Sequence, residues 1–174
     1  MNLIQKINKK IFSDNGKKVA SSHGLKRSSH WATVEKHFLE KNPVCVACAE
    51  KTFLHGIFAH QIHHIFPFHY AVLLGRPDLE TDFRNLITLC QVPQFQHHLL
   101  LGHLGDFHSY NPDVIKFVTD YRGLVKEDIV KSEFYKKTLE QKPKPFDLLT
   151  TQEKEEMLNK LNIDFPLSGR ISCI

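Results

Sequence analysis

Apolar residues recur at helical spacing in several parts of the chain and form short continuous runs in others. Trp31, Val34 and Phe38 lie three or four positions apart, so they share one face of a predicted helix. The serines at 28–29 offer side-chain caps for its first turn. The helix should end before Pro43, because a residue that precedes proline is disfavoured in helical geometry. We interpret its apolar face as core packing.

Two apolar runs further along the chain have the character of β-strands. The first, from about residue 59 to 65, is rich in isoleucine and histidine and ends at Pro67. The second covers residues 86–89, and the charged, glycine-containing interval 68–84 between them predicts a loop. Together they predict an antiparallel hairpin, which with the surrounding helices gives an α+β fold.

Helical patterns return in the second half of the chain. A short helix is predicted over about residues 96–102, and another follows Asn111, which is a good N-cap ahead of a proline. Residues 126–141 have the apolar spacing of one amphipathic helix. The last predicted helix starts with a capping box formed by Thr150 and Glu153.

The charge of the chain is distributed unevenly. The 174 residues have a formal net charge of +4, yet residues 1–27 carry seven lysine or arginine residues against one aspartate. This basic arm, whose residues 1–12 predict a short helix, favours nucleic-acid partners, although a solvated tail explains the charge equally well. No run reaches the ~18 apolar residues that a membrane span needs, so we expect a soluble protein with no membrane partner.

Cysteine and histidine are concentrated in the middle of the chain. Nine of the twelve histidines lie between residues 55 and 108, which indicates metal or proton chemistry there. The two-residue gap between Cys45 and Cys48 lets both thiolates reach one tetrahedral zinc. Without a secretory signal, this pair predicts a reducing, cytoplasmic environment. His63 and His64 are neighbours on a strand and should face opposite sides, which suits two different roles.

Several of these elements occur in the order found in one nuclease family. The Cys45–Cys48 pair is followed by His63-His64-Ile65 with Pro67, by Asn85-Leu86 with Leu89-Cys90, and by His98. On these motifs, residues 29–115 resemble the HNH nucleases, including a subgroup known from bacteria and phages. The resemblance implies a small ββα-metal (HNH) core, in which a β-hairpin and a helix surround one catalytic metal, with a structural zinc and additional flanking α-helices.

The resemblance also implies a role for each matching residue. His64 would be the general base, and Asn85 would fix its orientation. His63 and His98, with His103 as a third ligand, would hold one divalent ion (Mg²⁺, Mn²⁺, Ni²⁺ or Zn²⁺) that stabilises the leaving oxygen. His98 and His103 are five residues apart, which is not the four-residue spacing of one α-helical face. A turn position for Asn85 and a phosphate contact for His103 are open alternatives.

The implied zinc site departs from the family pattern. Relatives usually supply a second Cys-x-x-Cys, whereas here that pair is opened by an insertion and its last cysteine is replaced by His97. The implied structural site therefore consists of Cys45, Cys48, Cys90 and His97, a chemically sound set of three thiolates and one imidazole. His97 and His98 could exchange roles. Position 63 also departs from many relatives, which carry an aspartate there.

The resemblance predicts an endonuclease that hydrolyses phosphodiester bonds in DNA, while RNA is not excluded as the substrate. The predicted domains are a basic arm at 1–28, a nuclease core at 29–122 and a helical extension at 123–174. One HNH site cuts one strand, so cutting both strands implies a homodimer or successive nicks. The alternative is a non-catalytic zinc module that binds nucleic acid or a protein, which needs only the three cysteines and one histidine.

Overall fold

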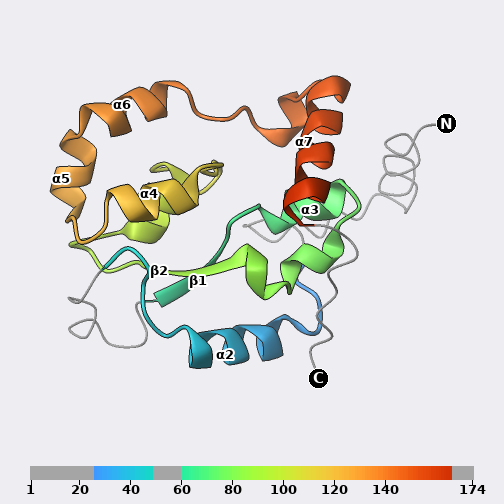
Figure 1. Cartoon of the computed structure of the whole chain (residues 1–174), viewed down its shortest axis with the longest axis horizontal. Helices are drawn as coiled ribbons and strands as arrows, with labels where there is room; N and C mark the ends of the chain where they lie inside the picture. The colour runs from blue at the N-terminus through green and yellow to red at the C-terminus, as the bar shows by residue number, and fades with distance from the viewer. Residues whose placement is uncertain (1–25, 49–59, 166–174) are drawn as a thin grey trace. The chain divides into compact units, whose positions relative to one another are not determined.

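The structure, a computed structural model, describes residues 26–48 and 60–165. Within these ranges the chain forms a small two-stranded sheet and short helices, so the α+β class is confirmed (Figure 1). The helix predicted over 1–12 lies outside the described residues. None of the helices in the described ranges is long and apolar enough to cross a membrane.

The elements are short and follow one another closely. In chain order they are α2 (Trp31–Lys41), β1 (His60–His64), α3 (Phe68–Leu73), β2 (Leu86–Cys90), α4 (Val114–Asp120), α5 (Lys126–Lys131), α6 (Glu133–Glu140) and α7 (Thr151–Asp164). Single turns of 3-10 helix form η3 (Pro77–Glu80), η4 (Phe83–Asn85) and η6 (Phe146–Leu148), and η5 (His98–Gly102) is a π-helix. The chain divides into two compact units between Pro143 and Lys144, and the second contains η6 and α7. The predicted three-part division stays a prediction.

The strands β1 and β2 form the predicted antiparallel hairpin, in a register that places His64 opposite Leu86. Alternate strand residues face opposite sides of the sheet. Ile62 accordingly packs against Phe38 of α2, whereas the ring of His63 lies 5.4 Å from a histidine ring of η5. The hairpin is therefore covered by α2 on one face and by η5 on the other.

Helix α2 has the predicted apolar face but not the predicted cap. Trp31 and Phe38 belong to a packed cluster with the hairpin. The N-cap residue is His30, and it makes no side-chain cap bond. The prediction of a serine cap is wrong, since α2 begins at Trp31 and both serines precede its N-cap. The backbone N–H of Ser28 lies 3.1 Å from each carboxylate oxygen of Glu80.

The interval 68–84, predicted as a loop, instead contains helix α3 and the turns η3 and η4. The prediction is wrong because Phe68, Ala71 and Leu79 are buried in the interior. Burial of such apolar side chains stabilises helices that are too short to form in isolation. The segment is consequently a packed part of the domain between the two strands.

The amphipathic pattern over 126–141 corresponds to two helices, α5 and α6, rather than one. The chain is extended at Ser132, with φ of −60° and ψ of 127°, so the helix is interrupted there. The hydroxyl of Ser132 accepts a hydrogen bond from the N–H of Tyr135 and caps α6. Serine favours this capping position over a helix interior.

The starts of α4 and α7 differ in how well they were predicted. Asn111 is not the N-cap of α4, which is Asp113. The Asn111 side chain instead donates to the carbonyl of Leu101 at 2.7 Å and accepts from the N–H of Asp113 at 3.0 Å, so it fixes the preceding turn. In α7 the predicted capping box is confirmed, with both reciprocal hydrogen bonds between Thr150 and Glu153.

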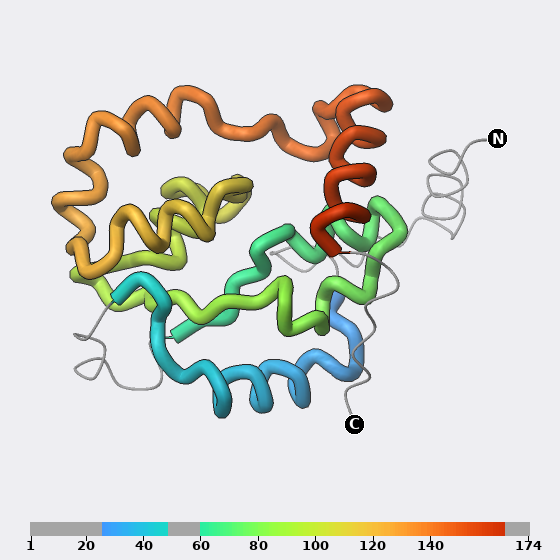
Figure 2. The backbone as a smooth tube through the Cα atoms, in the orientation of Figure 1, coloured from blue at the N-terminus to red at the C-terminus, as the bar shows by residue number. Residues whose placement is uncertain are grey.

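The main core is built from residues that are distant in sequence. Figure 2 follows the chain from β2 through η5 and on into α4. Leu89, Leu101, Phe117, Ile129 and Tyr135, from β2, η5, α4, α5 and α6 in turn, are all buried in this core. The elements that carry the candidate metal ligands are therefore held by packing from several directions.

Candidate metal centres

The four predicted zinc ligands come together in the interior. Cys45, Cys48, Cys90 and His97 are almost completely buried and form one group that could hold a metal ion. The Nδ1 atom of His97 lies 3.4–3.5 Å from each of the three sulfurs, and two of the sulfurs are 3.4 Å apart. Ligands at ordinary zinc distances on a tetrahedron would be about 3.5–3.8 Å apart, so the group fits zinc.

Three elements position these ligands. Cys45 and Cys48 lie in a tight turn, closed by a 3.2 Å backbone hydrogen bond between them and joined to β2 by the bond from the N–H of Val46 to the carbonyl of Thr88. Cys90 is the last residue of β2. The Nε2–H of His97 donates to the carbonyl of Leu124 at 3.0 Å, which leaves Nδ1 directed at the sulfurs. A second partner of this kind fixes the orientation of a metal-binding imidazole.

The proximity of the three thiols has an electrostatic consequence. Hydrogen bonds with Cys45 and Cys90, together with burial, raise the pKa of the Cys48 thiol, since neighbouring thiolates repel one another. A divalent cation among them would remove this repulsion and favour three thiolates. The donor set is thus suited to zinc on chemical grounds as well as geometric ones.

A second group of candidate ligands comes from β1 and from the two ends of η5. His63, His98 and His103 each offer one ring nitrogen, and these three atoms lie within 4.8 Å of one another. The structure therefore brings together the three residues predicted for the catalytic ion; we call them the histidine triad. His97 and His98 belong to different groups, as predicted, and do not exchange places.

Two ring nitrogens of the triad are buried without a hydrogen-bond partner in the described part of the chain. Nε2 of His63 and Nδ1 of His98 are buried and have no hydrogen-bond partner among the described residues. The Nδ1–H of His103 donates to the carbonyl of Ser109 at 2.8 Å, which leaves Nε2 as its acceptor. Burial lowers the pKa of all three imidazoles, that of His98 to about 3, so they are neutral at pH 7. Neutral, buried and unpartnered nitrogens fit a metal ion.

The π-helix explains how His98 and His103 join one site despite their five-residue spacing. A π-helix forms i→i+5 hydrogen bonds, so residues five apart return to the same side of the helix. The rings of His98 and His103 accordingly have centroids only 4.8 Å apart. The expectation from α-helical spacing does not apply, because local π geometry replaces it.

Gly102 makes room for the triad. A Cβ atom at this position would lie 2.8 Å from two atoms of the His63 ring, which is closer than real side chains approach. We expect Gly102→Ala to displace His63 and to weaken binding of an added second metal by about tenfold or more, since overpacking costs about 1–3 kcal/mol. Isothermal titration with Ni²⁺ or Mn²⁺, on protein that keeps its buried zinc, measures this. A folded variant that binds the second ion as tightly as wild type would refute the prediction.

His64 lies on the opposite face of β1 from the triad ligand His63. Its ring is stacked near Trp31 and Phe68, with centroids 5.1 and 5.6 Å away. The carbonyl of Glu80, which can only accept, lies 2.9 Å from Nε2, so we assign the hydrogen to Nε2. Nδ1 is consequently the acceptor atom of a neutral imidazole, because burial lowers the pKa of His64 to about 4.

Asn85 is completely buried and ties together the segments on either side of His64. Its Oδ1 accepts from the N–H of Phe66 at 2.7 Å, and its Nδ2 donates to the carbonyls of Phe66 and Leu79 at 3.0 and 2.9 Å. It therefore holds the chain two residues after His64 and the residue before Glu80. The catalytic roles of His64 and Asn85 stay predictions.

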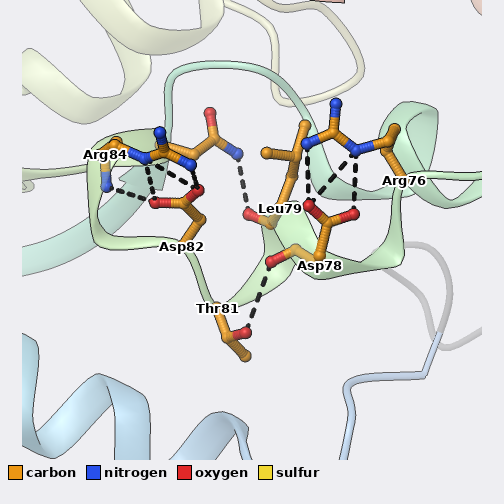
Figure 3. A network of polar contacts seen from close by, with 7 residues as sticks. Arg76, Asp78, Leu79, Thr81, Asp82 and Arg84 are labelled. Carbon is orange, nitrogen blue, oxygen red and sulfur yellow. Dashed lines mark hydrogen bonds and ion pairs between the residues drawn. The ribbon is translucent and has the colours of Figure 1, made fainter. Parts of the chain in front are cut away.

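Ion pairs stabilise the turns that carry Glu80 and Asn85. Arg76 donates to the carboxylate of Asp78, and Arg84 donates to the carboxylate of Asp82, at shortest distances of 2.8 and 2.5 Å (Figure 3). Asp82 also caps η4 by accepting from the backbone N–H of Arg84. The backbone around His64 is thus fixed by local polar contacts as well as by packing.

The triad and His64 line a single cavity of about 730 Å³. Arg27, His69 and Phe107 also line this cavity, although none was predicted as a site residue. Arg27 gave little signal because it is the last cation of the basic arm, and His69 has no recognisable spacing from the motifs. Phe107 lies in the segment 102–112, which is similar to a subgroup of HNH proteins, but that similarity gave it no role. The fold, not the local sequence, brings these residues to the cavity.

Acid is expected to destabilise the fold through buried histidines. Burial lowers the pKa of His64 and His69 to about 4, below the ordinary value of 6.5. Between pH 6.5 and 4 the unfolded chain therefore binds more protons than the folded chain, so stability is lost as the pH falls through this window. Each group contributes up to about 1.4 kcal/mol per pH unit.

Urea unfolding of the wild type and of His69→Gln between pH 5 and 7 measures this effect. The free energy of unfolding of the variant should depend less steeply on pH. The difference in slope should be up to about 1.4 kcal/mol per pH unit, which corresponds to one proton. Zinc content is followed at each pH, so that acid release of the metal is accounted for in both proteins. Equal pH slopes for the two proteins would contradict the assignment to His69.

Comparisons of the chain with protein-family models, curated proteins and solved structures find no match.

Proposed function

We propose that the protein is a metal-dependent endonuclease of the HNH type that hydrolyses phosphodiester bonds in DNA. The observation that carries this proposal is the convergence of the triad, with two buried and unpartnered ring nitrogens, in the same cavity as His64. A structural zinc site alone does not require this second group of histidines.

The triad would hold one divalent ion through His63, His98 and His103. When bound, such an ion would stabilise negative charge on the phosphate and the leaving oxygen. None of the described residues that line the cavity is acidic. An all-imidazole donor set suits Mn²⁺, Ni²⁺ or Zn²⁺ better than Mg²⁺, which prefers oxygen ligands.

His64 would act as the general base. Its neutral Nδ1 can accept the proton of an attacking water, while the bond from Nε2–H to Glu80 fixes the ring and favours this tautomer. Asn85 would support this orientation indirectly, through its bonds to Phe66 and Leu79 rather than to the imidazole. It is therefore a positioning residue in this mechanism.

The basic N-terminal residues favour a nucleic-acid substrate. The positive charge of residues 1–27 would attract a nucleic-acid backbone, and this contribution is independent of sequence. Duplex DNA is the proposed substrate, with RNA to be tested beside it. Cleavage of both strands would require a homodimer or two successive nicks. Three thiols in one zinc site fit a reducing compartment such as the cytoplasm.

The alternative is a non-catalytic zinc module that binds nucleic acid or a protein. The buried Cys₃His group favours it, since that group alone would stabilise such a module. This alternative gives no role to the buried, unpartnered nitrogens of His63 and His98. We therefore favour the nuclease over the non-catalytic zinc module.

Cleavage of supercoiled plasmid tests the proposal. Protein that holds one zinc per chain is incubated with Mg²⁺, Mn²⁺, Ni²⁺ or additional Zn²⁺, with a structured RNA as a parallel substrate. We expect nicking with Mn²⁺ or Ni²⁺ and loss of nicking in His98→Ala that retains the first zinc. Salt-dependent DNA binding without cleavage under every metal would support the non-catalytic module instead.

A further inference from the structure

Arg27 is held beside His64 by aromatic residues on both sides. Its guanidinium carbon lies 4.2 Å from the ring centre of Trp31 and 4.1 Å from that of Phe68. Aromatic faces attract a cation and restrict the plane of a guanidinium group. Trp31 and Phe68 belong to α2 and α3, which flank β1 in the fold. The side chain is thus oriented by the fold rather than left as part of a solvated arm.

Arg27 forms only a long ion pair with Glu80. Glu80 is buried, and the backbone N–H of Ser28 lies 3.1 Å from each of its carboxylate oxygens. The nearest guanidinium nitrogen of Arg27 is 3.8 Å away, beyond hydrogen-bond distance. The Arg27 side chain remains 38% exposed. Nη1 of Arg27 also lies 3.5 Å from Nε2 of His64, which is a long contact. Glu80 therefore attracts the guanidinium group electrostatically, while Nε and Nη2 of Arg27 can donate to a ligand in the cavity.

The cavity has the charge expected of an anion site. Arg27 is the only permanently charged residue among the described residues that line it. A guanidinium group in the same cavity as the histidine triad suits a ligand with several negatively charged oxygens. Guanidinium groups bind phosphate through paired N–H donors.

We infer that Arg27 binds a phosphate group of the nucleic-acid backbone in this cavity, beside His64 and the histidine triad. The inference deepens the proposed function and rests on it for the identity of the substrate. Glu80 positions both partners, since its carboxylate lies next to Arg27 and its backbone carbonyl orients His64. Glu80 thus contacts both His64, the proposed base, and Arg27, the proposed phosphate-binding residue.

Two measurements on the full-length, zinc-containing protein test this site. Binding of a fluorescent DNA duplex without added divalent metal is followed over a range of salt, and cleavage kinetics are measured with Mn²⁺. We expect Arg27→Gln to weaken binding and lower kcat/KM by about ten- to a hundredfold. The slope of log K against log salt should fall by about 0.9. Arg122→Gln is the matched control, since it removes an equal charge at an exposed residue that is absent from the cavity lining.

The outcomes separate this inference from the proposed function. If the wild type cuts DNA and Arg27→Gln keeps its salt slope and kcat/KM, Arg27 does not bind phosphate although the nuclease stands. If no metal supports cleavage but the salt slope still depends on Arg27, the phosphate site stands without the nuclease. Should Arg27→Gln fail to fold, Arg27→Lys serves instead. We expect it to keep the slope but lose kcat/KM, and a wild-type kcat/KM would overturn the inference.

Discussion

Replacing His64 by alanine is expected to reduce the rate of DNA cleavage by about 10²- to 10⁴-fold, the usual contribution of a general base. The physical reason is that Nδ1 of His64 is the acceptor of a neutral, orientated imidazole that lines the same cavity as the triad. His64 does not belong to the triad, which lies on the other face of β1. Its loss should therefore remove the base and leave the metal ligands in place.

The rate is measured under single-turnover conditions with Mn²⁺, together with the affinity for the second metal. His37→Ala is the matched control, because His37 is an exposed histidine of α2 that does not line the cavity. We expect the control to cut at the wild-type rate and His64→Ala to bind the second ion normally. A folded His64→Ala protein that cuts as fast as wild type would remove His64 from the mechanism.

The parts of the fold that could be predicted from the sequence are those fixed by local signals. The apolar spacing of Trp31 and Phe38 gave α2, and the two apolar runs gave the hairpin. The capping box at Thr150 and Glu153 is satisfied entirely within one turn, so its prediction needed no tertiary information. In each case the predictive signal lies in residues close together in the sequence.

The parts that could not be predicted depend on contacts between distant segments. Ser28 was predicted as a cap of α2, but the N-cap is His30. The backbone N–H of Ser28 instead contacts the carboxylate of Glu80, 52 residues away. The segment of helix α3 was predicted as a loop. The helix is stabilised by burial of Phe68 and Ala71, which the local sequence does not reveal. The break at Ser132 was missed because serine is compatible with both an exposed helix position and a cap.

In the candidate sites, too, residues with a local sequence signal were predicted and residues that depend on tertiary contacts were not. The spacing of Cys45 and Cys48 indicated a metal, and the order of motifs indicated the remaining zinc ligands, which the structure brings together. The spacing of His98 and His103 argued against one helical face, because π geometry leaves little trace in sequence. Arg27 could not be found from its neighbours, since Trp31 and Phe68 hold it through tertiary contacts.

If the buried Cys₃His group holds zinc, removal of that ion is expected to unfold the core, and this is the largest effect on stability that we predict. The hairpin has only five residues in each strand, so it buries little apolar surface without further support. Cys45, Cys48 and Cys90 belong to the main core, and His97 leads into η5. Structural zinc sites of this type bind with about 10–16 kcal/mol, which is as large as the whole stability of a typical domain, about 5–15 kcal/mol.

Cys48→Ala and Cys173→Ala form a matched pair for this prediction. Both remove one thiol, but only Cys48 belongs to the zinc group, whereas Cys173 lies outside the described residues. We expect Cys173→Ala to retain one zinc per chain and a cooperative thermal transition. Cys48→Ala, and wild type stripped by a high-affinity chelator, should lose both, because the uncompensated thiols and imidazole cannot hold the turn, β2 and η5 together. A zinc-free wild type that keeps its near-ultraviolet circular dichroism and its cooperative transition would show that packing alone maintains the core.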